Sequence, residues 1–339
     1  MIASRTHARS WVPNDAAELM DALVALWEGA FGSAYAVWSA TLVRATPLVL
    51  VGLAVAIAFR AGVLNIGAEG QLLVGAAGAT AVALALGGTA LPMPVVVTMM
   101  VIAGAVAGAA WAGIAALLRH RFGVLEVIST IMLNFVAIHL VSWLVRGPLQ
   151  EPTLAYPQSE TIADNARWPF LIPGQRLHLG FAIGLVLALL TWWVTARTAA
   201  GFRARAVGDG MRAAVSAGRV DAARTVTWVF LVSGACAGIA GAAEVGGVTW
   251  ALYEGISPGY GYTAIAVALL ARLDARWVIV SAVFFGALEA GAAAMQRNAG
   301  VPSVAVQVIV GVVVLAVLAG ARLHEAARVR RRTVHAEGL

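Results

Sequence analysis

Residues 197–224 read RTAAGFRARAVGDGMRAAVSAGRVDAAR and separate two long apolar runs, 179–196 and 226–248. The stretch contains six arginines and only two aspartates. Arginine-rich connections between membrane-spanning segments stay on the cytoplasmic side of the membrane. The stretch is longer than a minimal turn, and part of it has helical spacing. We therefore predict a short cytoplasmic helix here, between two transmembrane helices and offered to a partner protein.

The composition of the whole chain is that of a membrane protein. Hydrophobic residues make up 61% of the 339 residues and charged residues only 12%, whereas a soluble domain carries roughly 25% charged residues. The 36 glycines fit this class, because small residues let membrane helices approach closely. Two pairs have the spacing of such contacts, Gly104 with Gly108 and Gly234 with Gly238, although chance produces such pairs in a glycine-rich chain. We predict an all-α polytopic membrane protein.

Several function classes are excluded by residues that the chain lacks. It contains no lysine, which excludes a P-loop because the lysine of that loop contacts the phosphates. The single cysteine excludes an internal disulfide and a cysteine zinc site, and the six histidines lack metal-ligand spacing. The net charge of +6 is distributed over the loops, so we expect no nucleic-acid partner. We expect neither a metal site nor a catalytic site.

We predict ten membrane crossings from the apolar segments of the chain, a full crossing taking about 20 residues. They are residues 18–38, 41–59, 66–86, 95–118, 122–145, 179–196, 226–245, 260–271, 277–295 and 301–320. Acidic residues make the first segment amphipathic, and the eighth is as short as a broken half-helix. With both termini inside, the cytoplasmic segments hold 18 arginines and the external segments hold 5, which satisfies the positive-inside rule.

This topology divides the chain into three parts. Residues 1–17 form a cytoplasmic N-terminal segment, 18–321 form the transmembrane domain, and 322–339 form a basic cytoplasmic tail near the lipid headgroups. Within the domain, the external loop 146–178 contains five prolines, which favour extended and turn structure over helix. The loop 197–224, quoted above, lies on the cytoplasmic side.

Polar residues gather at a membrane boundary in FRAGVLNIGAEGQLLVGA, residues 59–76. Asn65 and Glu69 stand there among glycines. A carboxylate inside a span costs about 2.5–3.5 kcal/mol on insertion scales, so it faces protein or water and marks a pathway. The alternative for Glu69 is that its carboxylate caps the helix that opens near Ile66. Both interpretations stay open at this point.

A second polar group follows one face of the predicted helix at 122–145. Glu126, Thr130 and Asn134 recur every four residues and therefore share that face. Such a stripe either forms hydrogen bonds between helices or lines a pore. We favour pore lining for Asn134 and capping for Glu126. Glu244 adds a carboxylate inside another span, but no chain of charged partners that would relay protons accompanies it.

Four stretches carry a family resemblance: NIGAEGQ at 65–71, EVISTIMLN at 126–134, GFRARAVGDGMRAAVSAG at 201–218 and GYTAIAVALLARLDARWVIVSAVFFGAL at 261–288. They resemble the permease subunits of bacterial ATP-binding-cassette importers, in the nucleoside branch that is related to the ribose-type sugar permeases. The resemblance covers residues 43–321. It implies a multi-pass protein of the bacterial cytoplasmic (inner) membrane that has no cofactor and no enzymatic activity of its own.

The resemblance also implies three protein partners. They are a cytoplasmic ATP-binding subunit that binds ATP and Mg²⁺, a second permease subunit that forms a heterodimer as a sister chain, and an extracytoplasmic substrate-binding lipoprotein. The coupling segment of the family, which transmits the motion of the ATPase, corresponds to residues 201–218. The residues that match its pattern are Gly201, Arg203, Arg205, Ala206, Val207, Gly208, Ala213, Ala214 and Gly218. Arg219 departs from the pattern, because the family commonly has an apolar residue there.

We therefore predict the membrane-spanning subunit of a nucleoside importer that works by alternating access. The predicted pathway residues, which would bind ribose hydroxyls or base edges, are Asn65, Glu69, Asn134 and Glu244. Phe135 or Tyr262 would add aromatic contacts. Replacing Asn65 or Asn134 by alanine is expected to lower uptake without lowering membrane abundance. Two alternatives stay open: a simple-sugar permease of the same architecture, and an ion-coupled secondary transporter that needs no ATPase.

Overall fold

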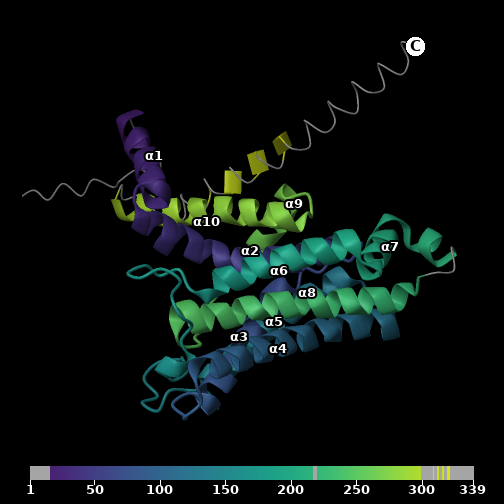
Figure 1. Cartoon of the computed structure of the whole chain (residues 1–339), viewed down its shortest axis with the longest axis horizontal. Coiled ribbons are helices and arrows are strands. Elements are labelled where there is room, and N and C mark those ends of the chain that lie inside the picture. The colour runs from purple at the N-terminus through teal and green to yellow at the C-terminus, as the bar shows by residue number, and fades with distance from the viewer. Residues whose placement is uncertain are drawn as a thin grey trace, which may run out of the picture. The chain divides into compact units, whose positions relative to one another are not determined.

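The computed structural model describes residues 16–216 and 220–298, together with scattered positions between 308 and 320. Within these ranges the named elements are all helices, and no strand is formed (Figure 1). In chain order they are α1 (Ala16–Phe31), η1 (Ala36–Thr41), α2 (Leu42–Arg60), α3 (Ala68–Leu86), α4 (Met93–Phe122), α5 (Glu126–Val145), η2 (Asp164–Ala166), α6 (Leu179–Arg197), α7 (Ala199–Ser216), α8 (Ala222–Glu244), η3 (Val245–Thr249), α9 (Tyr260–Leu270) and α10 (Ala275–Asn298).

Seven helices of the described ranges are long and apolar enough to cross a membrane. They are Ala36–Arg60, Ala68–Leu86, Met93–Phe122, Glu126–Val145, Leu179–Arg197, Ala222–Thr249 and Ala275–Asn298. The prediction of an all-helical multi-pass membrane protein is thereby confirmed, but the predicted number of ten crossings is not. The α1 helix has 16 residues and α9 has 11, both shorter than the about 20 residues of a full crossing. The predicted crossing at 301–320 lies largely outside the described residues.

The boundaries of the first two predicted crossings differ from the structure. The prediction ends one crossing at 38 and begins the next at 41, whereas η1 and α2 form a continuous helical stretch over Ala36–Arg60. The chain is interrupted earlier, after Phe31, where α1 ends. No proline or charged residue marks the true break, and the π-helix η1 has no signature in the pattern of apolar residues.

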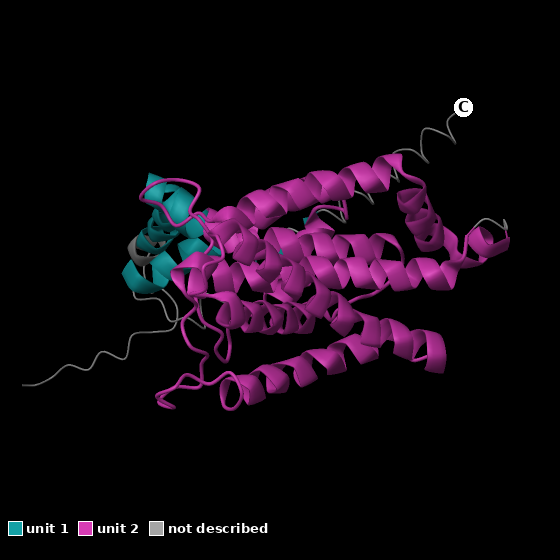
Figure 2. Ribbon diagram, turned by 60° about the horizontal axis from the view of Figure 1, so that its bottom comes forward, with its two compact units in different colours: residues 1–41, 286–339 teal, residues 42–285 magenta. Residues whose placement is uncertain are grey.

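The chain divides into two compact units, residues 1–41 with 286–339 and residues 42–285 (Figure 2). In the first unit, α1 packs against the second half of α10. Ala22 and Ala25 of α1 form a small apolar cluster with Ala292 and Met295 of α10. A side-chain hydrogen bond connects η1 to the end of α1: the hydroxyl of Thr41 donates to the carbonyl of Ala30 at 2.8 Å.

In the second unit, α8 is the central helix and packs against α4, α3 and α2 (Figure 1). Glycines permit this packing: a Cβ atom on Gly238 would lie 2.0 Å from the carbonyl oxygen of Gly104. One turn away, a Cβ atom on Gly234 would lie 2.4 Å from the carbonyl oxygen of Gly108. The two glycine pairs that the sequence alone could not distinguish from chance therefore face each other across the α4–α8 contact.

The helices of the second unit differ strongly in burial. In the most apolar part of the α8 stretch Ala222–Thr249, 72% of the residues are buried, compared with 28% for α5 and 17% for α6. Since lipid tails are as apolar as leucine, the exposed faces of α5 and α6 are suited to lipid or to another subunit. A binding site that is open to the surroundings of the protein would therefore lie on one of these two outer helices.

The loop 146–178 is ordered by its contacts with the chain that follows α8. The N–H of Ile162 donates to the carbonyl of Trp250 at 2.8 Å, and the N–H of Trp168 donates to that of Gly246 at 2.9 Å. The Trp168 side chain is buried. The loop thus has the irregular backbone that its prolines predict, and a buried tryptophan anchors it.

An ion pair fastens the end of α5 to the loop between η3 and α9. Arg146 Nε donates to Glu254 Oε1 at 2.7 Å, and Arg146 Nη2 donates to Glu254 Oε2 at 3.0 Å. The Ser142 hydroxyl also donates to Oε1. The Arg146 guanidinium, followed by this hydroxyl, lowers the pKa of Glu254 from its ordinary value of 4.5 to about 2.

Acidification is expected to loosen this ion pair. Because the pKa of Glu254 is lower in the folded chain, its stabilising contribution is complete above about pH 4.5 and is lost as the pH falls toward 2. Hydrogen exchange of the 250–259 backbone should therefore accelerate between pH 4.5 and 2, after correction for the intrinsic exchange rate. The effect should be small, because the pair is solvent-accessible. In Glu254→Gln the corrected rate should be independent of pH; an identical acceleration in that variant would contradict the assignment.

Candidate functional site

The α2 helix ends at the start of the first polar stretch. Gly62 has a φ angle of +70°, in the left-handed region that favours glycine. The N–H of Val63 donates to the carbonyl of Ala58 at 3.0 Å. This is the 6→1 hydrogen bond of a Schellman motif, which ends a helix. We refer to residues 61–67 as the α2–α3 connection. It leads directly into the protein interior, where the side chain of Asn65 is completely buried.

Asn65 contacts α3 and α8 directly through its amide group, and α2 through Ser233. Its Nδ2 donates to Gln71 Oε1 at 3.0 Å and to Ser233 Oγ of α8 at 2.9 Å. Its Oδ1 accepts from Gln71 Nε2 and from the N–H of Gly67, both at 3.0 Å. The Ser233 hydroxyl donates in turn to the carbonyl of Ala54 on α2 at 2.7 Å. Every hydrogen-bonding group of the Asn65 amide thus has a partner inside the protein.

Asn134 connects α5 with the beginning of α3. Its Oδ1 accepts from the N–H of Gly70 at 2.8 Å, and its Nδ2 donates to the carbonyl of Ile66 at 2.9 Å. The same Nδ2 lies 3.3 Å from the hydroxyl of Tyr262 on α9. One turn earlier on the same face, Thr130 Oγ1 accepts from the N–H of Ile66 at 3.3 Å. Thr130 and Asn134 of the polar stripe therefore form hydrogen bonds between helices, whereas sequence reasoning favoured pore lining for Asn134.

Glu69 caps a helix, but a different helix from the one predicted. Its Oε2 accepts a 2.6 Å hydrogen bond from the N–H of Gly261, in the first turn of α9. The Ser257 side chain forms a further hydrogen bond with this carboxylate. A carboxylate is favourable at the positive N-terminus of a helix. Glu69, which lies in the first turn of α3 and is buried, therefore joins the start of α3 to the start of α9.

Glu244 lies at the junction of α8 and η3. Its side chain is buried, and its carbonyl accepts from the hydroxyl of Thr249 at 3.3 Å. Burial, and then the negative charge of Glu244, raise the pKa of Tyr253 above its ordinary value of 10. This electrostatic effect places Glu244 beside the loop that contains Tyr253.

The structure thus brings together three of the four predicted pathway residues, Asn65, Glu69 and Asn134, around the first turn of α3. We call these three residues and their partners the α3 network. Ser233 and Gly261 belong to it and were missed by sequence reasoning. A single hydroxyl in an apolar helix is the only signal that Ser233 gives, and Gly261 takes part through its backbone, which gives none.

Replacing Asn65 by alanine is now expected to reduce membrane abundance together with uptake, unlike the expectation from sequence alone. The change leaves the buried polar groups of Gln71 and Ser233 without their Asn65 partner, at a cost of about 1–3 kcal/mol for each group left unsatisfied. Abundance by immunoblot and the melting temperature of the purified chain measure the effect. Gln296→Ala, a change of an exposed amide, is the control. Unchanged abundance with lost uptake would instead indicate a direct contact with substrate.

The arginine-rich stretch forms α7, whose two helical parts meet at a bend at Gly210, where the backbone is extended rather than helical. Val207 before this bend and Ala214 after it are buried. Phe202, Met211 and Val215 are large apolar residues that remain exposed. A helix with one face packed and apolar side chains left on its surface is suited to contact a further protein.

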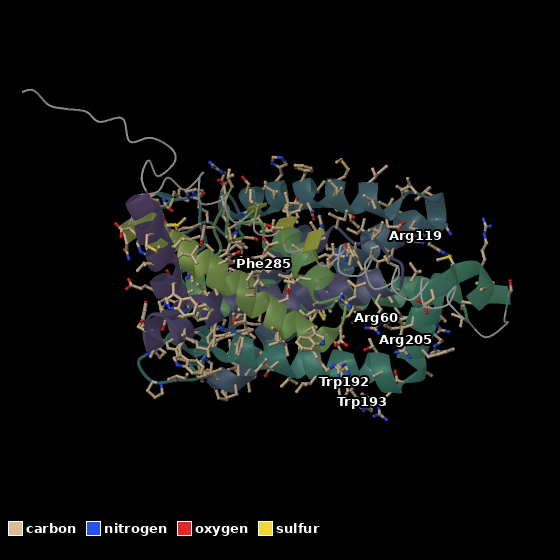
Figure 3. All side chains as sticks on the ribbon, turned by 90° about the horizontal axis from the view of Figure 1, so that it is seen from above. Arg60, Arg119, Trp192, Trp193, Arg205 and Phe285 are labelled. Atoms are coloured by element: carbon tan, nitrogen blue, oxygen red, sulfur yellow. The ribbon has the colours of Figure 1, made fainter. Side chains whose placement is uncertain are left out.

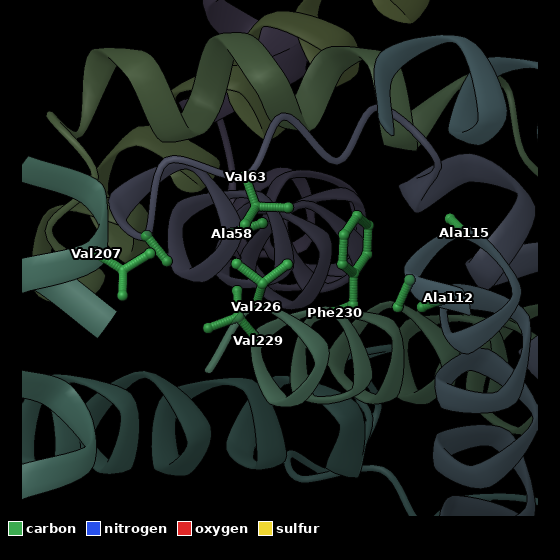
Figure 4. Packing of buried hydrophobic residues seen from close by; sticks show 10 residues of the cluster. Ala58, Val63, Ala112, Ala115, Val207, Val226, Val229 and Phe230 are labelled. Carbon is green, nitrogen blue, oxygen red and sulfur yellow. The ribbon is translucent and has the colours of Figure 1, made fainter. Parts of the chain in front are cut away.

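The part of α7 around Val207 and Gly208 contacts the end of α2. A Cβ atom on Gly208 would lie 2.2 Å from the carbonyl oxygen of Arg60, and one on Gly62 would lie 3.2 Å from the Cα atom of Gly208. Val207 joins an apolar cluster with Val63 of the α2–α3 connection (Figure 4). Further members of that cluster are Ala58, Ala61, Ala112, Ala115, Ala116, Val226, Val229 and Phe230. The backbones of α7 and of the α2–α3 connection are thus in direct contact.

The predicted coupling residues can be located individually. Those within α7 are Gly201, Arg203, Arg205, Ala206, Val207, Gly208, Ala213 and Ala214, whereas Gly218 lies outside the described residues. The guanidinium of Arg205 donates to the carbonyl of Thr195 on α6. Arg60, Arg119 and Arg205 lie toward the end of the second unit that carries α7 (Figure 3). Among the described residues, no three His, Cys, Asp or Glu side chains lie close enough to hold a metal ion.

Comparison with known proteins places these features in a family. Residues 37–318 match the model of the family described as branched-chain amino acid transport system / permease component. The guanosine ABC transporter permease protein NupP of Bacillus subtilis is 39% identical over 298 residues, which are 86% of this chain and 83% of NupP. The glucose ABC transporter permease protein TsgB13 of Haloferax volcanii is 40% identical over 284 residues, 81% of this chain and 74% of TsgB13.

A third relative is more distant. The nucleoside ABC transporter permease protein NupB of Lactococcus lactis subsp. cremoris is 30% identical over 298 residues, 85% of this chain and 80% of NupB. No solved structure matches the chain. The family match spans most of the chain, and the resemblance inferred from the four sequence stretches is confirmed. The protein is a transport subunit rather than an enzyme, and it belongs to the family of permease components of ATP-binding-cassette transporters.

Proposed function

We propose that the chain imports nucleosides, and that α7 is the coupling helix on which a separate ATPase subunit acts. The observation that carries the coupling role is the backbone contact between Gly208 and Arg60 at the end of α2. An ATPase that displaces α7 would also displace the last turn of α2, because no side chain lies between the two backbones to absorb the motion. The exposed Phe202, Met211 and Val215 are the surface that the ATPase would contact.

Two routes of contact would transmit motion from the last turn of α2 to helices inside the membrane. One is the α2–α3 connection, which leads to Asn65 and the rest of the α3 network. The other is the side chain of Arg60, whose Nη1 donates at 3.2 Å to the carbonyl of Leu273, between α9 and α10. The first route ends on α3 and the second directly after α9, and Glu69 joins these two helices. Motion of α7 would therefore tilt these two helices together, as alternating access requires.

The substrate proposal rests on the aromatic side chains next to the α3 network. Tyr262 is 45% exposed and its hydroxyl is held by Asn134; Phe135, the next residue of α5, is 52% exposed. Aromatic faces of this kind stack on nucleobases. We propose that both rings line the pathway and that Asn65, Glu69 and Asn134 position them, with Glu244 farther along. The names of the NupP and NupB relatives support a nucleoside, and that of TsgB13 supports a sugar as the second candidate.

The topology and partners of the proposal follow the arginine distribution and the family. Both termini and α7 would lie in the cytoplasm and the loop 146–178 outside, in the inner membrane of a bacterium. Three segments would complete ten crossings with the seven described ones: α1, α9 and residues 301–320. The partners would be an ATPase subunit carrying ATP and Mg²⁺, a sister permease and an extracytoplasmic substrate-binding lipoprotein.

Uptake of radiolabelled guanosine and uridine tests the proposal. Cells would express this chain together with its neighbouring transport genes, with either an active or a catalytically dead ATPase. We expect uptake only with the active ATPase, and competition by unlabelled nucleosides but not by glucose or ribose. Competition by the sugars alone would support the second candidate. Uptake that persists with the dead ATPase and collapses with an uncoupler would identify an ion-coupled carrier and refute the coupling role of α7.

A further inference from the structure

A groove of about 690 Å³ runs along the membrane-spanning parts of α6 and α8. Its walls are formed by residues such as Leu190 and Val194 of α6 and Val232 and Cys236 of α8, and Ile57 of α2 also lines it. Its volume lies within the range of about 300–1,000 Å³ typical of small-molecule sites. The α3 network contributes no residue to its lining.

The groove is apolar along its walls and charged at one end. The hydroxyl of Thr195 in the wall is engaged within its own helix, since it donates to the carbonyl of Thr191 at 2.7 Å, and so offers little to a ligand. The charged end is formed by Arg203 of α7 and by Asp221 and Arg224 at the start of α8. A ligand that fits must therefore be apolar over most of its length and polar at one terminus.

The charged end carries a net positive charge. Asp221 is engaged as the N-cap of α8, where its Oδ1 accepts from the N–H of Arg224 at 3.0 Å. Both Arg203 and Arg224 are exposed, and among the described residues neither guanidinium forms an ion pair. Two arginines at the mouth of an apolar groove are suited to the phosphate of a lipid headgroup, because basic residues near a membrane surface attract anionic lipids.

We propose that this groove binds one anionic phospholipid, with an acyl chain between α6 and α8 and its phosphate at Arg203 and Arg224. The groove opens toward the surroundings of the protein, since Leu190, Trp228 and Val232 at its walls are 49%, 58% and 45% exposed. A nucleoside fits poorly, because its polar groups are distributed over the whole molecule. The inference depends only on the chain spanning a membrane and holds for either candidate substrate.

The position of the site gives the lipid a role. Ala200, Gly201 and Arg203 belong to α7, so the headgroup end of the site includes the helix that rests on α2. A bound lipid would hold the first turn of α7 against α6 and α8. Lipid composition would thereby influence the mobility of α7.

Native mass spectrometry of the full-length chain tests lipid binding. The purified protein would be delipidated and titrated with phosphatidylglycerol or with phosphatidylcholine. We expect one phosphatidylglycerol to be retained, and the double variant Arg203→Gln, Arg224→Gln to weaken its binding by about fivefold for each arginine removed. The control variant Arg121→Gln, Arg212→Gln removes two exposed arginines that do not line the groove, and it should bind like the original chain.

A cysteine placed at Val232 of the groove wall, which is 45% exposed, gives an independent readout once the buried Cys236 is replaced by alanine. Phosphatidylglycerol should slow the alkylation of this introduced cysteine by a membrane-permeant maleimide, and less so when Arg203 and Arg224 are also replaced by glutamine. A bulky residue in the wall, Val194→Trp, should abolish lipid retention while both arginines remain. Equal binding of the two lipids, or equal loss in the control variant, would overturn the proposal. Protection of the introduced cysteine that requires the sister permease instead of lipid would likewise overturn it and identify a subunit interface.

Discussion

Replacing Gly238 by alanine is expected to reduce the amount of this protein in the membrane strongly. The added Cβ atom would lie 2.0 Å from the carbonyl oxygen of Gly104 and 3.1 Å from the Cα atom of Gly108. Both neighbours are backbone atoms, so the clash cannot be relieved by a rotamer change, and α4 and α8 must separate. Overpacking typically costs about 1–3 kcal/mol, and a backbone clash in the central helix contact should reach the upper part of that range.

The measurement is the amount of a fluorescent fusion in the membrane, together with the melting temperature of the purified chain. Gly113→Ala is the matched control on α4, since its Cβ atom would meet only the end of the flexible Leu231 side chain, at 3.3 Å. We expect the control to retain normal abundance. If Gly238→Ala also retained it, with an unchanged melting temperature, the close approach of α4 and α8 would be refuted.

The prediction from sequence was most successful where a single stretch carries the physical signal. The alternation of apolar runs with arginines indicated the membrane-spanning helices, and the same pattern located α7, because insertion and orientation depend on local composition. The fourfold spacing of Glu126, Thr130 and Asn134 indicated one polar face. In the structure Thr130 and Asn134 form hydrogen bonds to other segments, whereas sequence reasoning favoured pore lining for Asn134.

The contacts between distant parts of the chain could not be obtained in this way. The hydrogen bond from Gly261 to Glu69 joins residues 192 positions apart, and its donor is a backbone group that every residue except proline carries. Asn65 was identified as a polar residue in an apolar setting, yet its partner Ser233 lies 168 positions away. Polarity in a membrane segment therefore indicated which residues are constrained, whereas the choice between pathway lining and helix bridging required the partners.

Replacing Gly208 by alanine is expected to lower nucleoside uptake at least tenfold while ATP hydrolysis by the assembled transporter continues. The added Cβ atom would lie 2.2 Å from the carbonyl oxygen of Arg60 and 3.1 Å from the backbone of Ala61, so α7 must move away from the end of α2. A displacement of about 1 Å at a distant site can cost 10²-fold in a function that depends on alignment. The loss should appear in transport per ATP hydrolysed, because α7 keeps the exposed apolar residues proposed to contact the ATPase.

Gly210→Ala is the matched control, two residues farther along the chain, at the bend between the two helical parts of α7. Its Cβ atom would meet only the Cβ atom of Ala213, at 3.7 Å, and its φ of 179° is extended backbone that alanine adopts readily. The ratio of substrate transported to ATP hydrolysed, measured in proteoliposomes with the partner subunits, should fall in Gly208→Ala and remain unchanged in Gly210→Ala. If transport and hydrolysis fell in parallel, Gly208 would serve assembly with the ATPase. Normal transport in Gly208→Ala would show that motion reaches α3 and α9 by a route other than the α2 turn, and would leave Arg205, which bonds to α6, as the next contact to test.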